Sequence, residues 1–248
     1  DETRVKAVAA MSMLARHGKT VPAAASLRHA MEKDVSEAVR AEAGVALLSR
    51  HNEFGESALL QVLDRLPHEP SKAVTAHLFK ALPQHAKAFP LVLTEGLIGL
   101  LGAESSVIRA AACRSLATTV RVYDAKDPAG TAFERKDWFV VASKLPDKSG
   151  PALMKACSDP SAEVRVEAVS AVCALIPYVH EPLEGQGNPK LTAQLADVLI
   201  QCLNDENQFV RQMVLADVPP QLGIRKQFLV AAVISLLEQE AASFRDPA

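Results

Sequence analysis

The chain has 248 residues, of which 49% are hydrophobic and 4% aromatic, so a buried core must be built from Ala, Leu and Val rather than from rings. This composition favours helices. The 27 basic and 29 acidic side chains leave a formal net charge of −2, which excludes a strong global attraction to nucleic acid or to an acidic membrane surface. We expect neither a secretory leader nor a membrane span, because no apolar run is suitable for either.

Four cysteines lie far apart in the sequence and form no pair at zinc-binding spacing: Cys113, Cys157, Cys173 and Cys202. They are predicted to be small buried thiols in a reducing compartment, with a disulfide or a metal role as the alternative. The protein is therefore expected to be intracellular, in the cytoplasm or the nucleus.

A short motif recurs along the chain: an acidic residue followed five and six places later by Val-Arg. The full copies are Asp34 with Val39-Arg40, Asp159 with Val164-Arg165, and Asp205 with Val210-Arg211. The partial copies are Val5-Lys6, Glu69 with Val74-Thr75, and Ile108-Arg109 with Ala103 at the acidic position. Recurrence of this kind predicts a structure built from internal repeats.

The predicted elements are helices that alternate along the chain. Helices that carry the motif are predicted at residues 3–14, 34–48, 69–82, 103–116, 158–177 and 205–218. Each copy after the first is preceded by another apolar helix, at residues 21–33, 56–66, 89–102, 150–158 and 190–204, and residues 224–244 form one more. Prolines fall near the predicted helix starts, at Pro22 and Pro160, and near the predicted stops, at Pro67, Pro83 and Pro177.

Two spacings in these helices indicate close packing. Apolar residues three and four apart predict one buried stripe, formed by Val164, Ala168, Ala171, Val172 and Leu175. Glycines at every third position of another helix are interpreted as a close helix contact rather than a phosphate-binding loop: Gly96, Gly99 and Gly102.

The motif and the alternating helices resemble the HEAT-repeat family over nearly the whole chain. The resemblance implies an all-α fold, a right-handed α-α superhelix of about six helix pairs. We expect a single HEAT-repeat solenoid domain over residues 1–248, as a section of a longer array.

The resemblance also implies a ladder of hydrogen bonds between successive repeats, made by Asp34, Arg40, Arg109, Asp159, Arg165, Asp205 and Arg211. An aspartate before a helix accepts bonds from free N–H groups, and an arginine fork joins a neighbouring carboxylate. These residues are therefore predicted to be structural rather than ligand-binding. Thr75 replaces the arginine and Ala103 the acid, so the ladder should be interrupted in the third and fourth copies.

The longer steps between the later copies predict insertions near residues 121–149 and 180–190. The first insertion contains the single tryptophan, Trp138, which is interpreted either as the core of an extended helix or as an exposed contact. Insertions in repeat proteins often carry binding functions.

Catalytic motifs do not occur in the sequence: it holds no GxSxG, HExxH or Walker-type loop. The deoxyhypusine hydroxylases, a HEAT-like enzyme family, bind iron through His-Glu pairs. Here His68-Glu69 and His180-Glu181 each precede a proline in a predicted turn, which argues against a similar site. We therefore predict no catalytic residue, no cofactor and no metal, and we do not expect an enzyme.

Apolar residues also occur opposite the predicted core stripe: Phe79, Cys113, Val166, Val169, Cys173 and Leu215. Either neighbouring helices cover them, or a groove takes up an apolar segment of a partner. Arg114 and Gln212 lie on the same side and would supply polar contacts. The predicted partner-binding residues are Phe79, Arg114, Trp138, Val166, Val169, Gln212 and Leu215.

The sequence is interpreted as a non-catalytic scaffold or adaptor that presents a concave surface and inserted loops to a partner protein. The partner would offer a helical or extended apolar segment, or be part of a larger complex. The alternative is a nucleic-acid-associated HEAT protein of the chromosome-organising type, or a DNA glycosylase-like enzyme, although the charge balance disfavours direct contact with nucleic acid. No membrane partner is expected.

Overall fold

A computed structural model describes residues 2–16, 20–86, 88–122, 147–180 and 188–217, together with residues 230 and 234. Within these ranges the regular structure is helical and no strand occurs, which confirms the predicted all-α fold. The chain divides into two compact units, residues 1–126 and 127–248. Most of both predicted insertions, including Trp138, and the helix predicted at 224–244 lie outside the described residues.

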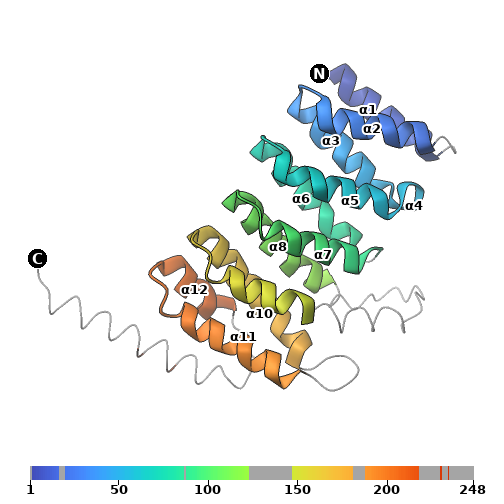
Figure 1. Cartoon of the computed structure of the whole chain (residues 1–248). Helices are drawn as coiled ribbons and strands as arrows, with labels where there is room; N and C mark the ends of the chain where they lie inside the picture. The colour runs from blue at the N-terminus through green and yellow to red at the C-terminus, as the bar shows by residue number, and fades with distance from the viewer. Residues whose placement is uncertain are drawn as a thin grey trace, which may run out of the picture. The chain divides into compact units, whose positions relative to one another are not determined.

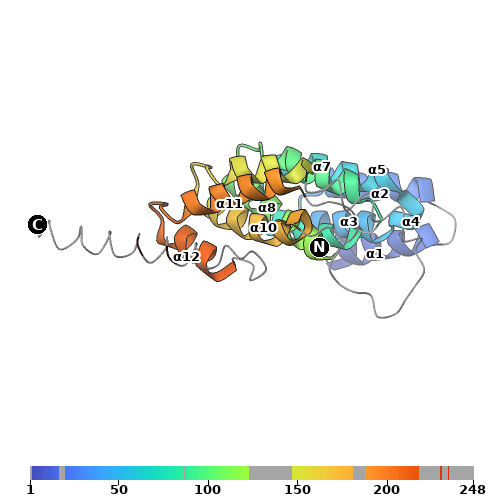
Figure 2. The same ribbon diagram turned by 90° about the horizontal axis from the view of Figure 1, so that it is seen from below.

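The first unit consists of helices in two layers (Figures 1 and 2). They are α1 (Glu2–Arg16), α2 (Thr20–Lys33), α3 (Glu37–Ser49), α4 (His51–Phe54), α5 (Glu56–Arg65), η1 (Leu66–His68), α6 (Lys72–Ala81), η2 (Leu82–His85), α7 (Pro90–Leu100) and α8 (Ser106–Val122). The helices that begin at a copy of the motif, which we call motif helices, contact one another in the order α1, α3, α6, α8. The others, which we call companion helices, do the same in the order α2, α5, α7.

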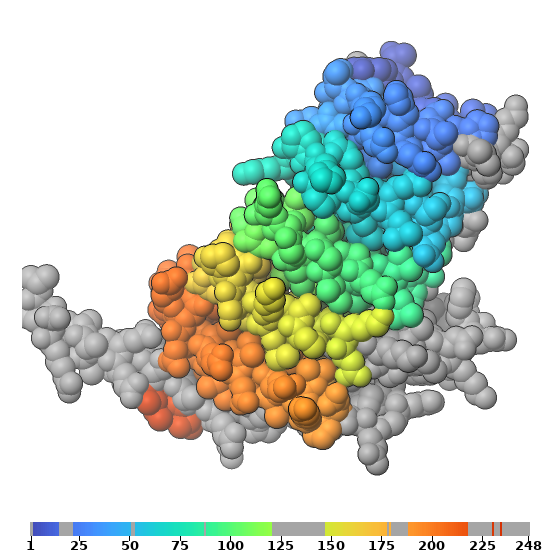
Figure 3. All heavy atoms as spheres, in the orientation of Figure 1, coloured from blue at the N-terminus to red at the C-terminus, as the bar shows by residue number. Residues whose placement is uncertain are grey.

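The second unit repeats this arrangement. Its companion helices are the helix at residues 147–156 and α11 (Pro189–Cys202), and its motif helices are α10 (Ala162–His180) and α12 (Gln208–Asp217). α10 packs against both α11 and α12. In the space-filling view, side chains fill the spaces between successive helices within each unit (Figure 3).

The predicted stripe on α10 is the core of the second unit. Its five members, Val164, Ala168, Ala171, Val172 and Leu175, are all fully buried. Because their spacing alternates between three and four residues, one face of the helix is removed from water along its length. The stripe was correctly predicted from the sequence.

Pro177 lies near the end of its helix, as predicted, but inside it. α10 continues three residues past it, to His180. A proline inside a helix removes one i→i−4 hydrogen bond, here to the Cys173 carbonyl. Ile176 and Val179 on either side are buried, so their packing offsets the lost bond.

The glycine spacing on α7 is only partly a packing feature. A Cβ placed on Gly96 would overlap the Leu63 side chain of α5, so glycine permits these companion helices to approach closely. Gly99 is exposed and has no atom within 4 Å of a Cβ position, and Gly102 lies in the turn after the helix. The predicted close contact is therefore correct for Gly96 and wrong for Gly99.

Candidate functional site

Each motif arginine binds the turn that precedes its own helix. Arg165 donates from Nη1 to the carbonyl oxygens of Asp159 and Pro160, at 2.9 and 3.3 Å. The same two bonds, to the residues six and five places upstream, are made by Arg40, Arg109 and Arg211. Since they require only backbone carbonyls, the bonds persist where Ala103 replaces the acid. The arginine thus fixes the turn between a companion helix and a motif helix.

The acidic residue of the motif organises the same turn from the other side. The carboxylates of Asp34, Asp159 and Asp205 each accept a hydrogen bond from the backbone N–H two residues later, at 2.8 Å. Glu69 accepts the equivalent bond from Ser71, at 3.0 Å. A carboxylate that satisfies a free N–H beside a helix start also faces the positive end of the helix dipole.

Arg40 and Arg165 extend their turns into bridges between successive repeats. Arg165 binds Asp205 through two bonds, Nε–Oδ2 at 2.7 Å and Nη2–Oδ1 at 2.9 Å. Arg40 binds Glu69 in the same way, Nε–Oε2 at 3.1 Å and Nη2–Oε1 at 2.8 Å. Arg65 adds a third bond to Glu69, at 3.1 Å. Each bidentate pair joins two successive repeats. The paired residues are 29 positions apart in the sequence for Arg40 and Glu69, and 40 for Arg165 and Asp205.

The carboxyl groups of both bridges are held in their charged form. Burial by itself would raise the pKa of Glu69, but bonds from Arg40 and the Ser71 N–H, with the charges of Arg40 and Arg65, outweigh it and lower that pKa. Burial by itself would also raise the pKa of Asp205. The bonds from Arg165 and from the Asn207 N–H outweigh burial, so this pKa is lowered as well. Both pairs are therefore ionised at neutral pH.

The start of the chain departs from the predicted register of the motif. Lys6, in the arginine position of the first partial copy, pairs with Glu2 on the same helix at 2.7 Å, and both side chains are exposed. Arg4 instead reaches Asp34, at 2.9 and 3.1 Å. Thr75, which replaces an arginine, donates to the Ser71 carbonyl of its own helix at 2.9 Å.

Glu69 belongs to a salt-bridge network. Its two oxygens accept bonds from Arg40, Arg65 and Ser71, while the adjacent His68 is exposed. Glu181, of the other His-Glu pair, lies outside the described residues. Across the described ranges, no group of three or more His, Cys, Asp or Glu side chains is placed to hold a metal ion.

All four cysteines are buried, and none of them forms a disulfide. A hydrogen bond with Cys157 lowers the pKa of the Cys202 thiol, against the effect of burial. Both residues lie at the ends of companion helices in the second unit, beside the turns that the motif organises.

The predicted partner-binding residues are placed in two different environments. Phe79 and Val169 are buried, so neighbouring side chains cover them, as one of the two interpretations held. Arg114 and Gln212 are exposed, Val166 is half-buried, and Leu215 is 41% exposed. Trp138 lies outside the described residues.

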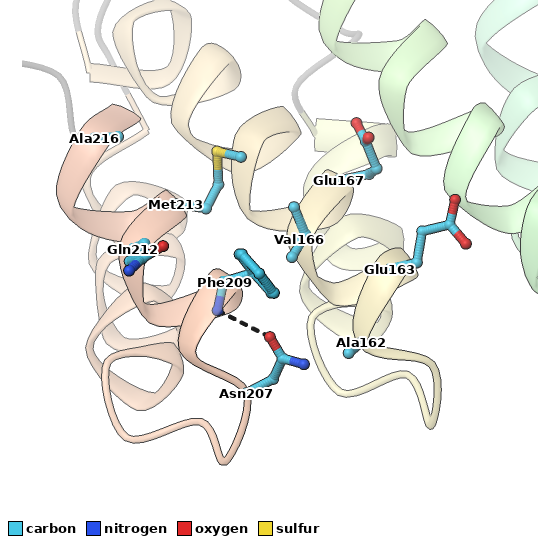
Figure 4. A pocket seen from close by; sticks show the side chains of 9 residues that line it. All are labelled: Ala162, Glu163, Val166, Glu167, Asn207, Phe209, Gln212, Met213 and Ala216. Atoms are coloured by element: carbon cyan, nitrogen blue, oxygen red, sulfur yellow. Dashed lines mark hydrogen bonds between the residues drawn. The ribbon is translucent and has the colours of Figure 1, made fainter.

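A groove between the motif helices α10 and α12 brings some of these residues together (Figure 4). It has a volume of about 500 Å³. α10 contributes Ala162, Glu163, Val166 and Glu167, and α12 and the turn before it contribute Asn207, Phe209, Gln212, Met213 and Ala216. Gln212 and Val166 were predicted from the sequence, whereas Leu215 does not line the groove.

Phe209 is one of the groove residues that the sequence prediction missed. Its side chain is 60% exposed, and its backbone N–H binds Asn207 Oδ1 at 2.9 Å (Figure 4). It directly precedes Val210 of the motif, and no other copy has an aromatic residue in that place. This difference between the copies is the sequence feature that could have identified Phe209.

The helix pairs and the repeated motif define an α-solenoid of the HEAT/armadillo-like class. Residues 150–179, which include Arg165 and its turn, match the HEAT repeat family. The chain therefore has an all-α solenoid fold of the HEAT/armadillo-like type, with a HEAT repeat matched over residues 150–179. Among curated proteins, none matches its sequence significantly.

Solved structures of engineered proteins are similar to this chain. One engineered protein shares 16% identity with a TM-score of 0.50, over 90% of each chain. A designed armadillo repeat protein shares 18% identity with a TM-score of 0.47, over 86% of this chain and 91% of the other. Another, solved with the peptide (KR)4, shares 18% identity with a TM-score of 0.49, over 88% and 90%. At 16% identity, the likeness to the first of these proteins concerns the fold alone. Within the described residues, no helix has both the length and the apolar character needed to cross a bilayer.

Proposed function

We propose that this protein is a non-catalytic scaffold or adaptor that binds another protein through the exposed face of its motif helices. The observation that carries the proposal is the exposed apolar surface of α12, where Phe209 is 60% and Leu215 41% exposed. Large apolar side chains left in water on one helix are typical of protein contact sites, where they become buried anchors.

The polar residues of the repeats support a structural rather than a catalytic role for the motif. The charged groups with shifted pKa values in the bridges, Arg40, Glu69, Arg165 and Asp205, are bound to one another and to their own turns. A catalytic group needs access to a substrate, and these side chains are at most about a tenth exposed. We infer that the motif builds the stack and that the exposed face of the motif helices does the binding.

The charge distribution favours a protein over nucleic acid as the partner. Glu163 and Glu167 lie on the motif helix α10, beside the groove, where a phosphate backbone would be repelled. The buried cysteines, which form no disulfide, support an intracellular location, in the cytoplasm or the nucleus.

The proposal is tested by capturing partners from a cell lysate with matched variants of the chain. In the first unit, Lys80→Glu combined with Arg114→Glu changes the exposed face of α6 and α8. In the second, Phe209→Ser combined with Leu215→Ser changes the exposed face of α12. These positions are exposed, so the variants are expected to stay folded, whereas glutamate at the buried Phe79 or Val169 would unfold its unit.

Controls of the same chemistry lie on the companion helices: Lys33→Glu on α2, Leu60→Ser on α5 and Ile200→Ser on α11. We expect a captured protein to be lost from at least one motif-helix variant and retained by the controls. Loss from the companion-helix variants with retention by both motif-helix variants would contradict the proposal.

A further inference from the structure

Two of the four cysteines, Cys157 and Cys202, lie together in the second unit. Cys157 directly follows the helix at residues 147–156, and Cys202 is the last residue of α11. A hydrogen bond joins the two thiols, and each residue is at most 5% exposed. Side chains from two successive repeats therefore meet at the ends of their companion helices.

The Arg165 bridge holds the ends of these two helices together. Arg165 donates to the carbonyl oxygen of Asp159, which lies two residues after Cys157. It also binds both carboxylate oxygens of Asp205, which lies three residues after Cys202. The backbone N–H of Asp205 donates to the Cys202 carbonyl oxygen at 3.2 Å. One guanidinium thus spans the two chain segments that carry the thiols.

The same two helices also approach each other closely near their starts. A Cβ placed on Gly150 would lie only 3.0 Å from the Leu191 side chain. With this contact at one end and the Arg165 bridge at the other, the helices have little freedom to separate at the cysteines. Two sulfur atoms held in hydrogen-bond contact need only a small movement to reach the S–S bond length of about 2.05 Å.

The surroundings of Cys202 favour its thiolate form. The hydrogen bond with Cys157 lowers the pKa of the Cys202 thiol, and the charge of Arg165 lowers it further, against burial and the charge of Asp205. Because the thiolate is the nucleophile in thiol oxidation, Cys202 is the attacking residue of the pair.

Both thiols lie directly beneath the surface of the unit. The residues next to them in the sequence, Ser158 and Gln201, are exposed. Helix ends open locally more readily than helix centres, so a small oxidant reaches this pair through a brief local opening. Cys113 and Cys173 are buried within the motif helices α8 and α10, away from the helix ends, which makes them matched controls.

We propose that Cys157 and Cys202 form a reversible disulfide on oxidation by a peroxide, and that this disulfide cross-links the two companion helices of the second unit. The Cys202 thiolate attacks one oxygen of hydrogen peroxide, the O–O bond breaks and hydroxide leaves, so Cys202 becomes a sulfenic acid. The Cys157 thiolate then attacks the Cys202 sulfur, the S–S bond forms, the S–O bond breaks and a second hydroxide leaves. The hydroxides take up the two thiol protons, so two thiols lose two electrons and the peroxide becomes two water molecules.

The cross-link restricts the unfolded chain more than the folded one. It closes a loop that contains α10, which lowers the conformational entropy of the unfolded second unit and stabilises the folded state. A dithiol reductant reverses it by thiol–disulfide exchange. Disulfides of reducing compartments are typically transient and redox-sensing in this way.

The test is mass spectrometry of the full chain after treatment with hydrogen peroxide and then iodoacetamide under denaturing conditions. We expect a monomer that has lost about 2 Da by oxidation and takes up two fewer alkyl groups than the reduced protein. Proteolysis should release a pair of fragments joined through Cys157 and Cys202. Dithiothreitol should restore full alkylation.

Variants locate the disulfide. Cys157→Ala and Cys202→Ala should each abolish the mass loss, whereas Cys113→Ala and Cys173→Ala should retain it. The thermal unfolding midpoint of the oxidised parent should lie about 5 °C or more above that of the reduced parent, and this difference should vanish in Cys157→Ala.

The contrary results are distinct. A disulfide through Cys113 or Cys173, a disulfide between two chains, or oxidation of Cys202 to a sulfinic acid without an S–S bond would overturn the proposal. Four thiols that all remain alkylated after peroxide treatment would also overturn it. The mapping on the parent protein decides these outcomes even where an alanine variant fails to fold. An unfolding midpoint that does not rise on oxidation would show that the bond does not cross-link the folded helices as proposed.

Discussion

Arg165 binds both carboxylate oxygens of Asp205 with one edge of its guanidinium, through Nε at 2.7 Å and Nη2 at 2.9 Å. The two side chains are 9% and 10% exposed. The third nitrogen, Nη1, donates hydrogen bonds to the carbonyl oxygens of Asp159 and Pro160. One side chain therefore fixes its own turn and ties it to the next repeat, 40 residues away.

The contributions of Arg165 and Asp205 to the free energy of unfolding should be strongly coupled. Replacing Arg165 with Met keeps the apolar stem and removes the fork, leaving Asp205 charged and nearly buried, so unfolding should become easier by about 2–3 kcal/mol. Asp205→Asn tests the partner. A double-mutant cycle by urea unfolding should give a coupling energy of about 1–3 kcal/mol. A coupling near zero would mean that the bridge does not hold the repeats together.

Stability should fall with acid through the two bridges. The pKa values of Glu69 and Asp205 are lowered in the folded protein, so the stability they contribute is fully present above the ordinary carboxyl pKa of about 4. It is lost as the pH falls through their lowered folded values. Unfolding measured between about pH 7 and about pH 3 should show a steeper loss for the parent than for Glu69→Gln combined with Asp205→Asn. Parallel curves would contradict the assigned bonds.

Two buried hydroxyls make no hydrogen bond to any described residue: Thr94 on α7 and Thr119 on α8. Thr94→Val and Thr119→Val replace a buried unpaired oxygen with a methyl group of similar size, so each should stabilise the first unit by about 0.5–1 kcal/mol. Thr75→Val is the matched control, because the Thr75 hydroxyl donates to Ser71, and it should destabilise by about 1 kcal/mol. Thermal unfolding that ranks the three variants in the opposite order would show that the burial is misassigned.

The glycines of α7 provide a matched pair on one helix. Gly96→Ala pushes a methyl group into Leu63 of α5 and should destabilise by about 1–3 kcal/mol. Gly99→Ala meets open space and raises helix propensity, so it should stabilise by about 0.5 kcal/mol. Opposite signs in urea unfolding are the expected result, and equal destabilisation would mean that Gly99 also faces a neighbouring helix.

The repeat architecture could be predicted because the motif determines the backbone conformation of the turn before each motif helix. An acid before a helix and an arginine six residues later build the same turn wherever they occur, so the register of helices followed from Asp34, Asp159 and Asp205. The prediction that Lys6 holds the arginine position of the first copy was wrong for a simple reason. Arg4 and Lys6 are both long cations near one helix start, and only the fold decides which of them reaches Asp34.

The candidate site was harder to predict because burial depends on the neighbouring helix. Val166 and Val169 are three residues apart on α10 and chemically identical, yet one lines the groove and the other is fully buried. Sequence periodicity places both on the helix surface but does not say which of them a neighbour covers. Phe209 was not predicted because it lies beside the motif valine, Val210, and the predicted contact positions lie opposite the core stripe.

The measurement that tests the account most directly is photo-crosslinking with a benzophenone side chain at single exposed positions, in lysate. Lys80 and Gln212 sample the motif helices, and Leu60 and Ile200 sample the companion helices, one of each in either unit. The account predicts a discrete crosslinked protein at Lys80, Gln212 or both, and none at the companion positions. Crosslinks confined to Leu60 and Ile200 would contradict it, because the binding face would then lie on the companion helices.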